Sequence, residues 1–108
     1  MNAVGSSVAS SSEVDVEAVV RARYFVDFED SARILAGDFK RALDAGKVRP
    51  DHIVGTVGDV LIGAAAGRSS PTEITFFKSL GMVAEDLVAA EHILARANED
   101  NRGVVIDW

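Results

Sequence analysis

Two short apolar runs constrain the fold of this chain more than any other feature. Residues 24–28 (YFVDF) and 74–77 (ITFF) are rich in β-favouring side chains. They lack the alternation of apolar and polar residues that marks a strand with one solvent-exposed face. Such runs are typical of strands in a parallel sheet that helices cover on both faces. Residues 2–4, which precede a glycine turn at Gly5, predict the end of a third strand. The chain is therefore predicted to be an α/β protein built on a parallel sheet.

Helical patterns separate these runs. Ser10 with Glu13, or Ser12 with Asp15, has the spacing of a capping box before a helix that ends near Arg23. Apolar residues at helical spacing predict three more short helices, at 31–36, at 38–46 and around 53–61. Helices and strands thus alternate along the chain, as they do in parallel α/β folds.

The last predicted helix is unusually apolar. It follows a tight turn at residues 79–81 and covers about 82–98. Its apolar surface extends well beyond one stripe and comprises Val83, Ala84, Leu87, Val88, Ala89, Ala90, Ile93, Leu94, Ala95 and Ala97. A helix this apolar is expected to pack on more than one side, against the rest of a larger domain or a second subunit. An ordinary alanine-rich surface helix is the alternative.

Composition narrows the class of function. The 108 residues carry a net charge of -6, and the 11 Lys and Arg residues are scattered, which disfavours nucleic acid binding. The absence of cysteine excludes disulfides and thiolate zinc sites and fits a reducing cytoplasm. The N-terminal residues lack the pattern of a signal peptide, and no apolar run approaches the length of a membrane span. We therefore expect a cytoplasmic protein that binds neither nucleic acid nor membrane.

The residues alone leave the chemistry open. His52 and His92 lie 40 positions apart without metal-binding spacing, so we expect surface or helix-face histidines and no metal site. The sequence contains no P-loop and no GxGxxG motif. Asp27, Glu29 and Asp30 could act as paired carboxylates in acid–base chemistry, but helix capping at a strand end is the favoured interpretation.

The order of several motifs resembles one enzyme family. NAVGSS, EVD at a helix start, FVDF, AGDF, GR and EITFFKSLGMVAEDL occur in that order from Asn2 to about Asp107. This order is similar to the C-terminal third of the ornithine cyclodeaminase/mu-crystallin family, and EITFFKSLG is its most specific part. Members are dimeric NAD(P)-binding enzymes that act on amino acids or cyclic imines. They include ornithine cyclodeaminases, alanine dehydrogenases and ketimine or pyrroline-carboxylate reductases.

The resemblance implies an incomplete fold. It predicts the second half of a doubly wound, Rossmann-like sheet, with residues 1–108 as a single partial domain and the helix at about 82–98 returning to a dimerisation domain. The half that carries GxGxxG and the residues that clamp the substrate carboxylate are missing. We therefore expect a C-terminal fragment, or a subunit that forms a homodimer or joins a separate N-terminal part. Alone it should be inactive and should not bind NAD or NADP. A non-catalytic dimerisation or assembly module is the alternative.

The resemblance also assigns roles to single residues. It implies that Asn2, Ala3, Val4 and Gly5 lie beside the nicotinamide and ribose at the carboxyl ends of the strands. It implies that Ser79 contacts the cofactor and that the backbone of Leu80 lies by the substrate.

Two departures from the family pattern bear on the chemistry. Ser7 stands where true cyclodeaminases have a catalytic aspartate. A hydroxyl at an ordinary pKa cannot replace a carboxylate base, so a dehydrogenase or imine reductase is favoured. Residues 9–12 (ASSS) lack the proline and the cation that relatives often carry. The resemblance therefore does not predict a contact of this loop with the cofactor's phosphates or ribose. For residues 6–12 a flexible loop is the alternative to a ligand-binding role.

Overall fold

A parallel sheet of four strands, in the order β1-β4-β2-β3, forms the centre of the computed structural model, which describes residues 1–106. The strands are β1 (Asn2–Ala3), β2 (Arg23–Val26), β3 (Ile53–Thr56) and β4 (Thr75–Lys78). All three neighbouring pairs run parallel, with Tyr24 of β2 opposite Phe76 on one side and Ile53 on the other. The predicted α/β class is confirmed. The proposed end of the family resemblance, Asp107, lies outside the described residues.

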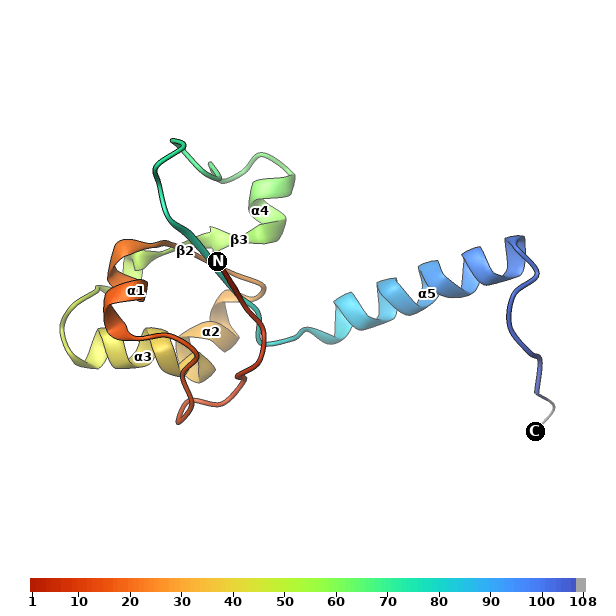
Figure 1. Ribbon diagram of the computed structural model, residues 1–108, viewed down its shortest axis with the longest axis horizontal. Helices are drawn as coiled ribbons and strands as arrows, with labels where there is room; N and C mark the ends of the chain where they lie inside the picture. The colour runs from red at the N-terminus through yellow and green to blue at the C-terminus, as the bar shows by residue number, and fades with distance from the viewer. Residues whose placement is uncertain (107–108) are drawn as a thin grey trace.

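Short helices connect the strands. They are α1 (Val16–Arg21), α2 (Glu29–Leu35), α3 (Gly37–Asp44), the 3-10 turn η1 (Pro50–His52) and α4 (Val57–Leu61). The longer helix α5 (Val83–Glu99) follows the last strand. Figure 1 shows α1, α2 and α3 grouped on one side of the strands, while α4 lies apart from them next to β3.

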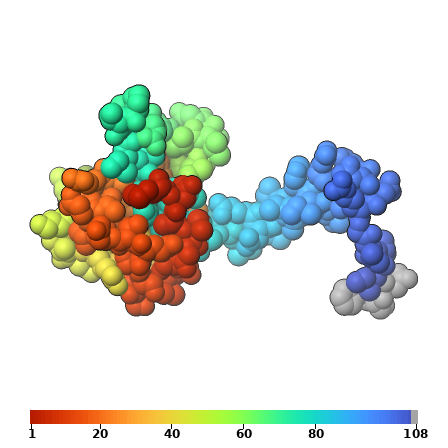
Figure 2. Space-filling model, in the orientation of Figure 1, coloured from red at the N-terminus to blue at the C-terminus, as the bar shows by residue number. Residues whose placement is uncertain are grey.

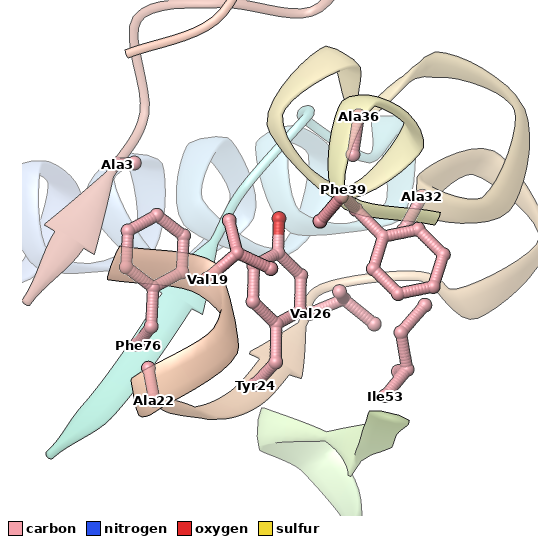
Figure 3. Packing of buried hydrophobic residues seen from close by; sticks show 11 residues of the cluster. Ala3, Val19, Ala22, Tyr24, Val26, Ala32, Ala36, Phe39, Ile53 and Phe76 are labelled. Atoms are coloured by element: carbon pink, nitrogen blue, oxygen red, sulfur yellow. The ribbon is translucent and has the colours of Figure 1, made fainter. Parts of the chain in front are cut away.

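The core lies between the sheet and the group of α1, α2 and α3 (Figure 3). Tyr24 is fully buried and stacks on Phe76, with 5.0 Å between ring centroids, while Phe39 of α3 approaches it at 5.7 Å. In β4, Phe76 and Lys78 are buried, whereas Thr75 and Phe77 are only half-buried. The expectation that this strand is buried on both faces is therefore wrong, because helices cover mainly one face of the sheet at β4.

The predicted capping boxes before α1 do not form. Asp15 is the N-cap and accepts a hydrogen bond of 2.8 Å from the backbone N–H of Ala18. The hydroxyl of Ser12 donates to the carbonyl of Val14, and the carboxylate of Glu13 binds partners far along the chain. The helix ends at Arg21, and residues 23–26 form strand β2, which pairs with β4.

Residues 53–61 also differ from the prediction. The segment expected as one helix begins with strand β3, in which Ile53, Gly55 and Thr56 pair with β2. Only Val57–Leu61 is helical, and it starts from a capping box between Thr56 and Asp59. The apolar spacing fits a helix, but pairing with a neighbouring strand outweighs such a short periodic pattern.

Helix α5 extends away from the rest of the molecule (Figures 1 and 2). The radius of gyration is 17.3 Å, whereas a compact domain of this length has about 13 Å. None of the residues of α5 is buried, and Leu87, Val88, Ile93 and Leu94 are each at least 63% exposed. The wide apolar surface predicted for this helix is thus present and is uncovered by the described residues. Among residues 1–106, no helix is long and apolar enough to cross a membrane.

Candidate functional site

The carboxyl ends of β1 and β4 meet at one edge of the sheet. Ala3 pairs with Lys78, and the backbone N–H of Ser79 donates to the carbonyl of Ala3 over 3.0 Å. Open α/β sheets bind ligands at the carboxyl ends of their strands. The residues assigned from the resemblance, 2–5 together with Ser79 and Leu80, are therefore neighbours at the edge where a ligand would bind.

These residues differ in what they present to solvent. Asn2 and Gly5 are exposed, and Val4 is 71% exposed, so they can contact a ligand. Ala3 is 5% exposed and belongs to the core cluster, so its side chain contributes packing. Ser7 is exposed in the loop that follows β1. The structure thus brings the assigned residues together but leaves only some of them open to a ligand.

Asp27 holds the turn that carries Ser79 and Leu80. Its Oδ2 accepts hydrogen bonds from the hydroxyl of Ser79 (3.0 Å) and from the backbone N–H groups of Leu80 (2.6 Å) and Gly81 (2.7 Å). Its Oδ1 accepts from the N–H of Phe28 over 2.8 Å, and the residue is 8% exposed. These four bonds make Asp27 an anchor for the turn after β4.

The capping interpretation of the acidic cluster is therefore wrong, because no side chain caps α2. Phe28 is the N-cap of α2 and provides no side-chain cap, while Glu29 and Asp30 lie in the first turn, where a helix dipole favours negative charge. Glu29 pairs with Arg33 along the helix. Asp27 points instead to a segment more than 50 residues away.

Glu13 holds the turn after β1 in a similar way. Its Oε1 accepts from the N–H of Gly5 over 2.9 Å, and its Oε2 accepts from the N–H of Ser6 over 3.2 Å. The ammonium of Lys78 lies 2.5 Å from Oε2. The hydrogen bond from Lys78, and to a smaller degree those from Gly5 and Ser6, hold the pKa of Glu13 below its usual value although desolvation opposes them.

Buried Asp38 provides a second partner for the ammonium of Lys78. The side chain of Lys78 is fully buried, and its Nζ also lies 3.6 Å from Oδ2 of Asp38, which is likewise buried. Asp38 Oδ1 accepts hydrogen bonds from the Tyr24 hydroxyl (2.8 Å) and from the N–H of Phe39 (3.0 Å). Burial raises the pKa of Tyr24 far above its usual value, and the negative charge of Asp38 raises it further to a smaller degree. The hydroxyl therefore stays protonated in the folded state.

The loop between β1 and α1 packs on α3. Arg41 donates to the carbonyl of Ser10 over 3.0 Å. At Gly37 a Cβ atom would lie 1.9 Å from the carbonyl oxygen of Ser11, so only glycine permits this approach. Residues 10 and 11 of this loop thus have defined contacts with α3.

The histidines occupy separate positions. Nε2 of His52 lies 2.8 Å from the carbonyl of Val19 and joins η1 to α1. His92 is exposed on α5. Within the part of the chain that the structure describes, no three His, Asp or Glu residues cluster in a way that could hold a metal ion.

The fold and the sequence of this chain match one family. The profile of the Ornithine cyclodeaminase/mu-crystallin family covers residues 1–101. The chain belongs to this family. Among curated relatives, the Delta(1)-pyrroline-2-carboxylate reductase of Bacillus cereus is 31% identical over 109 residues, which are 100% of this chain and 34% of that protein. The chain thus spans about a third of the length of the curated relatives it matches.

Solved structures of family enzymes have the same fold. The Delta(1)-pyrroline-2-carboxylate reductase of Thermococcus litoralis, in complex with NADH and L-proline, matches with a TM-score of 0.87 and 28% identity over 97% of this chain and 32% of that one. An archaeal alanine dehydrogenase dimer with bound NAD matches with a TM-score of 0.80 and 31% identity over 99% of this chain and 33% of that one. The relatives of this chain therefore include NAD-dependent imine reductases and an alanine dehydrogenase.

Sequence reasoning missed the residues that support the edge of the sheet. Glu13 was assigned to a capping box, and neither Lys78 nor Asp38 was singled out. Lys78 ends an otherwise apolar strand, and a lysine at such a position is a signal that it has a buried partner. The partners themselves lie 40 and 65 residues away, where no local pattern could reveal them.

Proposed function

We propose that this chain is the C-terminal part of an NAD(P)-dependent imine reductase or amino acid dehydrogenase. The observation that carries the proposal is the meeting of the β1 and β4 ends at one edge of a sheet similar to that of a reductase bound to NADH and L-proline. A reading frame that encodes GxGxxG directly upstream of this one would support the proposal. Unrelated sequence there would contradict it.

The described residues fit one wall of a cofactor site. Asn2, Val4 and Gly5 are exposed and would contact the ribose and nicotinamide of a bound cofactor, and the buried hydroxyl of Ser6 has no hydrogen-bond partner among residues 1–106. Ser79 donates its hydroxyl proton to Asp27, so it can only accept a hydrogen bond from a ligand.

Leu80 is similarly restricted. Its backbone N–H is bound to Asp27, which leaves its carbonyl for a substrate. When bound, the reduced nicotinamide supplies the hydride. The exposed residues Asn2, Val4 and Gly5 would contact it from one side.

A reductase or dehydrogenase reaction is favoured over cyclodeamination. Ser7 offers a hydroxyl at the position of the family's catalytic aspartate, and a hydroxyl cannot act as the carboxylate base. Hydride transfer to the carbon of a preformed iminium, whose nitrogen already carries its proton, needs no carboxylate base at that position.

The chain alone is expected neither to bind the cofactor nor to turn over ornithine, alanine or a cyclic imine. Its sequence has no GxGxxG turn, and the N–H groups of Gly5 and Ser6, which could otherwise cradle an anion, are taken by Glu13. Titration of the pure 108-residue chain into NADH should give no saturable quenching of fluorescence. Saturable quenching would overturn this expectation.

A chimaera tests the proposed activity. The corresponding third of the Bacillus cereus reductase is replaced by this chain, with the truncated reductase alone as the control. We expect the chimaera to oxidise NADH in the presence of Δ1-pyrroline-2-carboxylate and to release no ammonia from L-ornithine. An inactive chimaera would contradict the proposal, and ammonia release would favour a cyclodeaminase.

A non-catalytic assembly module is the second candidate. The observation that favours it is the uncovered apolar surface of α5, including Leu87, Val88 and Leu94. Size-exclusion chromatography with light scattering should then give a dimer, which Leu87→Glu should dissociate and the conservative control Glu91→Gln should not. A monomer that stays in solution would argue against this candidate. The cytoplasmic location expected from the sequence stays a prediction.

A further inference from the structure

We propose that Glu13 and Lys78 are positioning residues that fix the backbone of Gly5 and Ser6 at the end of β1. Their effect on a cofactor rests on the function proposed above, whereas their effect on the backbone does not. Neither residue is among those that the family resemblance assigns to the site.

The carboxylate of Glu13 closely fits the turn that it holds. Its two oxygens accept from two successive backbone N–H groups, those of Gly5 and Ser6, at 2.9 and 3.2 Å. A Cβ atom at position 5 would lie 2.9 Å from Glu13 Oε1, so a larger residue there would displace the carboxylate. The carboxylate therefore fixes the conformation of the chain where β1 ends.

Lys78 fixes the position of the carboxylate. Its side chain is 0% exposed, and a buried ammonium is stable only beside a partner of opposite charge. Its Nζ lies 2.5 Å from Glu13 Oε2 and 3.6 Å from Asp38 Oδ2. Because Lys78 also pairs with Ala3 in the sheet, the same residue ties both the strand β1 and the turn after it to β4.

The core determines where Lys78 points. Asp38 lies in the first turn of α3 and is held by the hydroxyl of Tyr24, whose ring stacks on Phe76. A continuous chain of contacts thus runs from the centre of the core through Asp38, Lys78 and Glu13 to the N–H groups of Gly5 and Ser6. An exposed ion pair contributes little and has no such buried contacts behind it. The buried contacts of Lys78 and Asp38 therefore favour a positioning role for this pair.

Amide hydrogen exchange on the 108-residue chain, measured by NMR, tests the backbone role. In Glu13→Gln the side chain keeps its shape but has one acceptor oxygen and no charge. One of the two positions that accept from Gly5, or from Ser6 and Lys78, therefore becomes an NH2 group that faces a donor, and the other accepts more weakly. We expect the N–H groups of Gly5 and Ser6 to exchange about tenfold faster. Those of Leu80 and Gly81, which Asp27 holds, should keep their rates.

Two further variants complete the test. Glu17→Gln, which breaks an exposed ion pair with Arg21, is the matched control and should leave Gly5 and Ser6 unchanged. Lys78→Met combined with Asp38→Asn removes the two fully buried charges together, so that neither is left without its partner, and should again release Gly5 and Ser6. Unchanged exchange at these two residues, or equal acceleration throughout the sheet, would overturn the proposal.

The active chimaera tests the effect on the cofactor. There Glu13→Gln should raise the KM for NADH about tenfold while kcat changes less than about threefold, because a displaced backbone weakens binding more than hydride transfer. An unchanged KM in an active chimaera would overturn the cofactor role and leave the proposed function standing. An inactive unaltered chimaera would contradict the proposed function, and the exchange rates would then decide the inference alone.

Discussion

Replacing Asp27 by asparagine removes one charge from the contact that joins the sheet to the turn before α5. Asp27 accepts four hydrogen bonds, from the hydroxyl of Ser79 and from the N–H groups of Leu80, Gly81 and Phe28. An asparagine has one acceptor oxygen, so it can satisfy either the turn or Phe28, and its NH2 group then faces a donor.

The cost can be estimated from these contacts. Hydrogen bonds to a charged group contribute about 1.5–3 kcal/mol each, against about 0.5–1.5 kcal/mol for neutral ones. Three bonds lose the charge and the fourth, to Phe28, is lost. Because three of them share one oxygen, their contributions are not additive, and we discount the sum to about 3 kcal/mol. This is a large part of the roughly 5–15 kcal/mol that stabilises a typical domain.

Urea denaturation followed by circular dichroism measures this loss. We expect the free energy of unfolding of Asp27→Asn to fall by about 3 kcal/mol and Tm to fall by about 12 °C. Asp30→Asn, an exposed residue in the first turn of the same α2 region, is the control and should change stability by less than about 0.5–1 kcal/mol. A loss below about 1 kcal/mol in Asp27→Asn would refute the view that its carboxylate anchors the turn.

Three other variants or conditions test the core and the loop. Phe76→Ala empties the space beside Tyr24 and should lower the free energy of unfolding by about 3–5 kcal/mol in the same assay; a loss below about 1.5 kcal/mol would contradict the packing. Gly37→Ala should cost about 1–3 kcal/mol because its Cβ would collide with the backbone of the 9–11 loop, whereas Gly58→Ala in α4 should be neutral or stabilising. The pKa of Tyr24 is raised in the folded state, so stability should fall with rising pH once the pH exceeds the ordinary tyrosine pKa near 10, and this group should not lower it below that pH. Since Tyr24 is the single tyrosine, tyrosinate absorbance should appear only together with loss of the circular dichroism signal, and ionisation of an intact fold near pH 10 would contradict this.

Local patterns predicted much of the fold because they report local energetics. The run YFVDF predicted β2, ITFF predicted β4, and the SLG turn predicted the start of α5, since each is a short segment with a distinct propensity. The same reasoning failed at β3, where the apolar spacing of 53–61 fits a helix but a free strand edge on β2 was available. It also failed before α1, where two capping boxes were possible and Asp15 was the residue used.

The sequence by itself determined the α/β class and the family, and the family resemblance predicted that residues 2–5, Ser79 and Leu80 share one site. Only the tertiary structure decided how that edge is held. Glu13 meets Lys78 across 65 residues, and Asp27 meets Leu80 across 53. The physical reason is that the local sequence around a carboxylate does not distinguish one that caps the next helix from one that binds a distant turn. The choice depends on which donors the packed sheet brings within hydrogen-bond distance.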